Sequence, residues 1–131
     1  MDDAAAKSAQ PHKEAAMEFL RLVASGEVRE AYRRHIGPGF RHHNPFFRSG
    51  AESLMAAMEE NAAKNPGKVL EIQRALQDGD LVAVHSRVRQ QVGDLGAAVI
   101  HVFRFHGGRI AELWDVGQAV PGDSPNEHGM F

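Results

Sequence analysis

The sequence predicts an α+β domain, on three observations. Apolar residues between positions 11 and 64 recur at the three- and four-residue spacing of amphipathic helices. From position 68 onward, long apolar runs are typical of strands. Two turns suited to β-hairpins, Asp78-Gly79 and Gly107-Gly108, separate these runs. Helices followed by an antiparallel meander of four strands indicate an α+β architecture.

The first half of the chain predicts two helices and a short extended piece. A helix opens at Pro11, buries one apolar face and ends at Gly26. A second helix covers residues 28–36, and Gly37-Pro38-Gly39 stops it. Phe40 to Asn44 should then be extended, because Pro45 biases the preceding residue away from helix.

A third helix is expected over residues 50–64. Ser49 and Glu52 have the spacing of a capping box at its start, and Asn65-Pro66-Gly67 ends it. Strands should follow over residues 68–77, where Leu70, Ile72 and Leu76 share one face, and over residues 81–92. The segment Ala97–Gln118 completes the meander as a hairpin.

Length and composition limit the class of protein. The 131 residues suffice for a single domain, 1–131, with an ordered core over 11–118 and tails at 1–10 and 121–131. A net charge of −2, from 15 basic and 17 acidic residues, predicts neither a nucleic-acid nor a membrane partner. The absence of cysteine excludes disulfides and cysteine nucleophiles. Because the N-terminus lacks a hydrophobic signal region, we expect a cytoplasmic protein.

The strand that begins at Ala97 is apolar on both faces. One face carries Val99, His101, Phe103 and Phe105, and the other carries Ala98, Ile100 and Val102. Helices can cover one face, but a domain of this size has little left to cover the other. The pattern therefore predicts a homodimer that packs sheet against sheet.

Three ionisable residues stand inside otherwise apolar strands: His85, His101 and Asp115. Burial of such groups costs free energy unless they have a partner or a task, so they are the candidate catalytic residues. Each also has a structural interpretation. The two histidines could bind backbone groups in the core, and Asp115 could be an acceptor at the end of a strand.

Three segments, Arg41–Pro45, Leu81–His85 and Gly108–Gln118, resemble the SnoaL-like group. That group takes its name from a polyketide cyclase and shares the cone-shaped, cystatin-like α+β fold of ketosteroid isomerase, scytalone dehydratase and nuclear transport factor two. The resemblance implies helices packed in the concave face of a curved, mostly antiparallel sheet. It also implies catalysis without a cofactor, in which one aspartate serves as acid and base, and Asp115 is the matching residue.

Further candidates come from the same segments. His43 and Asn44 lie before the third predicted helix, where they could donate at the mouth of a pocket, and Trp114 could wall a flat ligand. Gln118, at the end of WDV-x-Q, completes the predicted substrate-binding set. Trp114 and Asp115 are neighbours, so only a bulge would place both in one pocket.

The sequence thus predicts a cofactor-independent lyase, isomerase or cyclase that acts on a small hydrophobic carbonyl compound by acid–base catalysis. A non-catalytic protein that binds a small hydrophobic ligand is the alternative. A metal site formed by His43, His85, His101 and Asp115 is a third reading, but the spacing matches no compact metal motif, so we expect neither metal nor cofactor.

Overall fold

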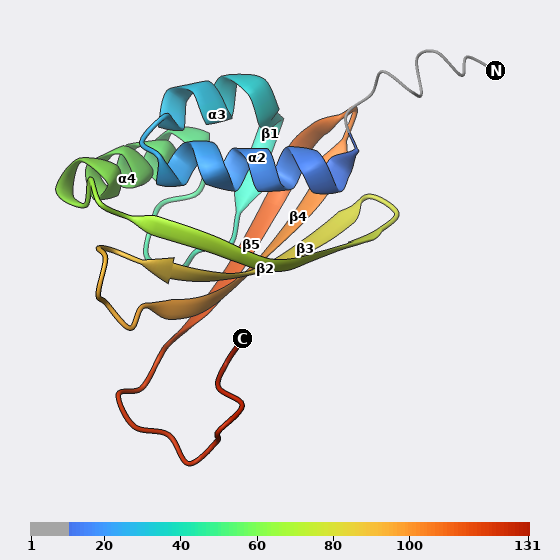
Figure 1. Cartoon of the computed structure of the whole chain (residues 1–131). Helices are drawn as coiled ribbons and strands as arrows, with labels where there is room; N and C mark the ends of the chain where they lie inside the picture. Colours follow the sequence, from blue (N-terminus) through green and yellow to red (C-terminus); the bar gives the residue numbers. More distant parts are fainter. Residues whose placement is uncertain (1–10) are drawn as a thin grey trace.

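Figure 1 shows the computed structural model, which describes residues 11–131. Its elements, labelled as in that figure, are α2 (His12–Ala24), α3 (Val28–His35), β1 (Ile36–His42), α4 (Ala51–Lys64), β2 (Val69–Asp78), β3 (Leu81–Arg89), β4 (Ala97–His106) and β5 (Arg109–Ala119). The strands form one sheet in the order β1-β5-β4-β3-β2. All neighbours pair antiparallel except β1, which runs parallel to β5.

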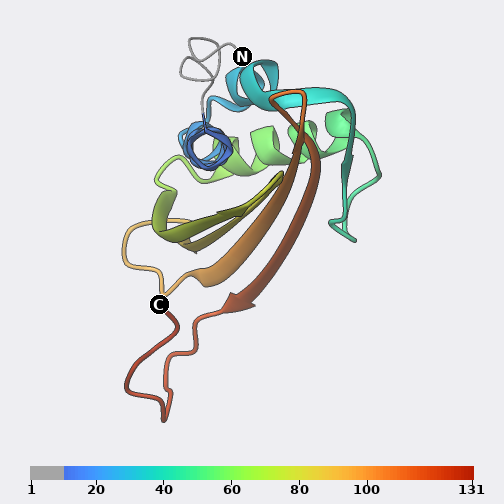
Figure 2. The same ribbon diagram turned by 90° about the vertical axis from the view of Figure 1, so that its right-hand side faces the viewer.

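The sheet is curved, and the helices lie across its concave side (Figures 1 and 2). This confirms the predicted α+β cone architecture. The core lies between the helices and the concave face, where Phe19, Phe103 and Ile110 are among the largest fully buried side chains. We call the opposite side of the sheet the outer face. The predicted tail at 1–10 falls outside the described residues. None of the helices within residues 11–131 is both long and apolar enough to span a bilayer.

The first two helices form as predicted, but the second ends earlier and differently. α3 stops at His35, and Gly37-Pro38-Gly39 lies inside β1 rather than after a helix. Pairing between β1 and β5 is irregular between Ile36 and Arg41. An irregular edge strand tolerates proline because it does not need every N–H in the ladder. Gly37-Pro38-Gly39, which we expect from the sequence to end a helix, is therefore part of a distorted edge strand.

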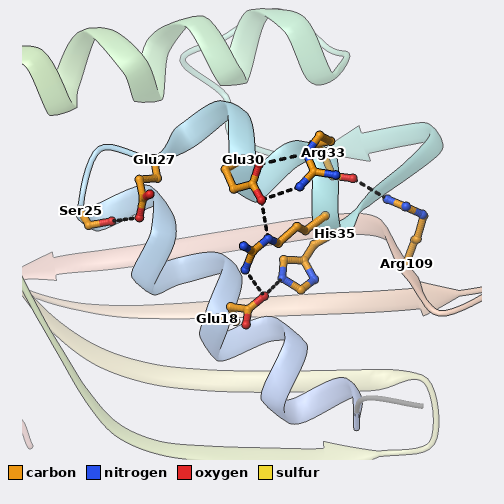
Figure 3. Close-up of polar contacts among 8 residues, drawn as sticks. Glu18, Ser25, Glu27, Glu30, Arg33, His35 and Arg109 are labelled. Carbon is orange, nitrogen blue, oxygen red and sulfur yellow. Dashed lines mark hydrogen bonds and ion pairs between the residues drawn. The ribbon is translucent and has the colours of Figure 1, made fainter. Parts of the chain in front are cut away.

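Polar contacts tie α2, α3 and the β4–β5 hairpin together (Figure 3). The Glu18 carboxylate accepts a hydrogen bond from Nε2 of His35 at 2.6 Å, and Arg34 lies 3.5 Å away. The bond from His35 holds the pKa of Glu18 below its ordinary value. Arg109 donates to the Arg33 carbonyl at 3.0 Å. The buried His35 ring is thereby satisfied, and the first two helices are fixed on the sheet.

The predicted capping box at the start of α4 does not form. Gly50 occupies the N-cap with a φ of 102°, and no side chain caps the helix. A positive φ is a conformation that glycine adopts readily, and here it moves Ser49 out of the capping position. The Ser53 hydroxyl instead donates to the Arg48 carbonyl at 2.6 Å.

The four-strand meander is confirmed, with one irregularity in the pairing of β2. Gly107 and Gly108 have φ values of 59° and 78°, as a tight hairpin turn requires. In β2, however, the register shifts between Ile72 and Arg74. A bulge of one residue exchanges the faces beyond it. Leu76 is therefore 66% exposed, although the alternation predicts that it shares the buried face with Leu70.

The last residues do not extend freely from the sheet. Beyond β5 the chain loops away and turns back (Figures 1 and 2). The Phe131 ring stacks on His85 with 5.7 Å between ring centroids, and the Arg87 guanidinium lies 5.2 Å from the Phe131 centroid. The predicted tail at 121–131 thus covers part of the outer face.

Candidate functional site

A cavity of about 400 Å³ lies between the helices and the concave face of the sheet. Apolar side chains make most of its wall, among them Leu20, Val23, Leu54, Met58, Leu70 and Val99. Its polar residues are Asn44, Asn61, Lys68, Gln90, His101 and Asp115. A concave, mostly apolar cavity with a few polar groups is the usual form of a site for a small organic molecule.

The structure brings His101 and Asp115 together. They stand directly opposite each other on β4 and β5, so their side chains share a face, and both line the cavity. Nδ1 of His101 is buried and has no hydrogen-bond partner among the described residues. Burial lowers the pKa of His101 to about 4. The negative charge of Asp115 raises this pKa in part, and the positive charge of Lys68 lowers it. The ring is therefore neutral at neutral pH.

Asn44 positions the Asp115 carboxylate. Its Nδ2 donates to Oδ2 of Asp115 at 3.2 Å, and its Oδ1 accepts from the Phe46 N–H at 3.0 Å. The second bond fixes the side-chain amide in the turn that follows β1. Asn44 thus lies at the cavity, where the sequence places it, and holds the carboxylate in one orientation.

The other three predicted binding residues lie outside the cavity. The His43 ring stacks on Trp114 with 4.9 Å between centroids, and its Nε2 donates to Glu112 at 2.5 Å. Strand pairing is regular from Ala97 to Arg104 on β4, so no bulge brings Trp114 to the side of Asp115. Gln118 lies four residues beyond Trp114, so it points to the same face of β5, and it is exposed. These three residues therefore do not line the cavity with Asp115, because they belong to the outer face.

Glu112 is the centre of a charged cluster on the outer face that the sequence did not reveal. Arg41 and Arg104 lie 3.3 Å and 3.0 Å from its carboxylate, beside His43. The hydrogen bond from His43 and the two guanidinium groups lower the pKa of this buried carboxyl. The cluster joins β1, β4 and β5. Because its charges are paired with one another, we assign the cluster a structural role.

His85 also lies away from the cavity. Its neighbour Val84 is fully buried and stands opposite His101, so His85 points to the outer face. There it contacts Arg74 and Phe131. His85 therefore does not share the cavity with His101 and Asp115. The considered metal set is likewise divided between two faces, and residues 11–131 hold no group of three or more His, Asp or Glu placed to bind a metal.

Lys68 is a cavity residue that the sequence did not reveal, as are Asn61 and Gln90. Its side chain is half-buried, its Nζ donates to Oδ1 of Asn61, and burial lowers its pKa. The sequence contains a signal for Lys68, because it precedes Leu70 and Ile72 by two and four residues. In an extended chain, residues at this spacing point to the same face of the sheet. The cavity therefore combines a carboxylate, a neutral imidazole and an amine within apolar walls, which are groups suited to proton transfer.

Comparison with known proteins identifies the family and the fold. The model of the SnoaL-like domain matches residues 16–113, which is most of the chain. No curated protein matches it significantly by sequence. Among solved structures, IdmH of Streptomyces antibioticus, a candidate polyketide cyclase, superposes with a TM-score of 0.67 at 19% identity, over 82% of this chain and 92% of that one.

Two further structures share the fold at similar distance. AclR of Streptomyces galilaeus, a candidate hydroxylase, gives a TM-score of 0.68 at 19% identity, over 82% of this chain and 88% of that one. An NTF2-like protein from Cytophaga hutchinsonii gives 0.65 at 17% identity, over 82% and 90%. These likenesses show the fold, and the candidate activities differ between them. With the family model matched from α2 into β5, the chain belongs to the SnoaL-like domain family.

Proposed function

We propose that this protein is a cofactor-independent lyase, isomerase or cyclase that acts on a small hydrophobic carbonyl compound. The observation that supports the proposal is the pairing of Asp115 with a neutral His101 on one wall of an apolar cavity. The fold it shares with a candidate polyketide cyclase fits the same chemistry. The reaction varies within the family, so the reaction of this protein depends on the residues of its own site.

In the proposed mechanism Asp115 is the base. Its carboxylate takes a proton from the carbon next to the substrate carbonyl, and the electron pair moves to the carbonyl oxygen to form an enolate. An N–H of the neutral His101 ring donates to that oxygen and stabilises its charge. In an isomerisation, protonated Asp115 then returns the proton to another carbon. In an aldol cyclisation, the enolate carbon first attacks a second carbonyl carbon of the substrate, whose C=O electron pair becomes an alkoxide, and Asp115 returns the proton to that alkoxide. No proton is gained or lost over the cycle.

One observation favours the alternative of a binding protein without catalysis. The hydrogen bond from Asn44 to Asp115 also fixes the turn after β1. Asp115 would then be a structural acceptor, and the cavity would only hold a hydrophobic ligand. The two functions differ in one property, which is whether the bound compound loses a proton.

Exchange of substrate protons with solvent tests the proposal. Cyclic ketones and β-keto esters small enough for the cavity are incubated with the protein in deuterated buffer, and mass spectrometry follows deuterium at the carbon next to the carbonyl. We expect at least one compound to exchange faster with protein than without it. Compounds that bind in a thermal-shift assay but never exchange would favour the binding protein.

We also propose that the protein is a homodimer through the outer face of β4 and β5. The half-buried Ala98, Ile100 and Val102 and the 69% exposed Val116 support this. Val116→Asp should convert a dimer to a monomer in sedimentation equilibrium, because it places a charge in the apolar interface. Val92→Asp, at an 83% exposed loop position, is the matched control. A wild-type monomer at all concentrations would contradict the proposal.

A further inference from the structure

Within residues 11–131, Lys68 is a cation in an apolar cavity and has no acidic partner. It forms no ion pair with any residue of the described chain, and its Nζ donates to the side-chain oxygen of Asn61 on α4. Lys64, the last residue of α4, differs from Lys68 in this respect. Lys64 is exposed and lies 2.7 Å from Glu60.

Placing an ammonium group in such a cavity costs free energy that a neutral hydrogen bond only partly offsets. The lowered pKa of Lys68 reflects that cost. A folded protein avoids it by placing the amine in water, as it does for Lys64. A cation held at an apolar wall is instead suited to a ligand that brings the missing negative charge.

We propose that Lys68, with Asn61, binds the carboxylate of an apolar organic acid, so that the cavity prefers keto acids to neutral ketones. This inference rests on the proposed function, because it names the substrate class of the same site. The Lys68 ammonium pairs with one carboxylate oxygen, and the Asn61 amide is free to donate to the other.

The arrangement of the cavity also orients such a ligand. Lys68 lies immediately before β2, whereas His101 and Asp115 lie on β4 and β5, and β3 lies between β2 and this pair of strands. A carboxylate is attracted to Lys68 and repelled by Asp115, so only one end-to-end orientation is favourable. The apolar body then lies over Leu70 and Val99, and its carbonyl end lies at Asp115.

The alternative is a structural role, in which Lys68 ties the last turn of α4 to β2 through Asn61 and interacts with the helix C-terminus. The two roles predict opposite results for Lys68→Met. If Lys68 is structural, removal of its amine lowers thermal stability and changes no ligand preference. If it is a binding residue, removal abolishes a preference and leaves the empty protein as stable as before or more stable.

The experiment compares two probes of similar shape by calorimetric titration at pH 7: 2-naphthoate, which carries a carboxylate, and 2-acetonaphthone, which is neutral. We expect the wild type to prefer 2-naphthoate by about tenfold or more, as a charge-assisted hydrogen bond allows. Lys68→Met should lose that preference, and Lys68→Arg should keep most of it. Lys64→Met, the matched control on α4, should behave as the wild type.

Equal affinity of the wild type for both probes, or a preference that survives in Lys68→Met, would overturn the inference. If Lys68→Met does not fold, Lys68→Gln makes the same comparison, since it keeps a donor for Asn61 without the charge. The measurement involves no turnover. A preference for 2-naphthoate without any proton exchange would therefore uphold the carboxylate site while contradicting the acid–base function.

Discussion

Asp115→Asn is expected to slow deuterium exchange of an active ketone by about 10²–10⁴-fold, the usual contribution of a positioned general base. The amide has nearly the shape of the carboxylate and can still bond to Asn44, but it cannot take a proton at neutral pH. Affinity for the ketone should change little, because the apolar wall is intact. Mass spectrometry of the exchanged ketone gives the rate, and titration gives the affinity.

Asp123→Asn is the control for this substitution. Asp123 lies exposed in the segment after β5, so the same loss of charge there should leave exchange unchanged. Full activity of Asp115→Asn would remove Asp115 as the base. Equal losses in both variants would point to overall charge rather than to the cavity.

The stability of the protein is expected to fall between pH 6.5 and pH 4 because of His101. Its pKa is about 4 in the folded protein and about 6.5 in an unfolded chain. In this window the unfolded state binds a proton at His101 that the folded state does not, so acid favours unfolding. Stability is full above pH 6.5, and this contribution stops changing below about pH 4. The loss is at most about 3 kcal/mol, less to the extent that cavity water reaches the ring.

His101→Gln isolates this effect, because glutamine does not titrate. The difference in free energy of unfolding between wild type and variant, from urea denaturation at a series of pH values, should change in favour of the variant as pH falls. His128→Gln, at an exposed position, should follow the wild type. Parallel profiles for wild type and His101→Gln would mean that His101 is hydrated and protonates normally, which contradicts a neutral ring in the cavity.

Most of the fold could be predicted from the sequence, because hydrophobic spacing and turn residues act locally. The helix over 51–64 and the hairpin at Gly107-Gly108 are examples. Irregularities of pairing could not be predicted. The bulge in β2 that exposes Leu76, and the proline-containing edge strand β1, depend on neighbouring strands that the local sequence does not specify.

Some of the predicted site residues line the cavity and others do not. The alternation of side chains between the two faces of a strand explains both results. Asp115 and His101 have the parity of buried neighbours and do face the cavity. Parity also separates Trp114 from Asp115, and the regular ladder of β4 and β5 leaves no bulge to join them. His85 follows the same rule, since its neighbour Val84 faces inward. Similarity of short segments to a family indicated which residues to consider, but only side-chain direction could show which ones share a cavity.

A crystal structure with 2-naphthol bound shows which face of the sheet holds the functional site, since the naphtholate oxygen resembles an enolate oxygen on a flat apolar ring. We expect the ring to occupy the cavity on the concave side of the sheet, with its oxygen within hydrogen-bond distance of His101 or Asp115. A ligand bound instead on the outer face, against Trp114 and His43, with the cavity unchanged, would contradict the claim that the concave side holds the functional site.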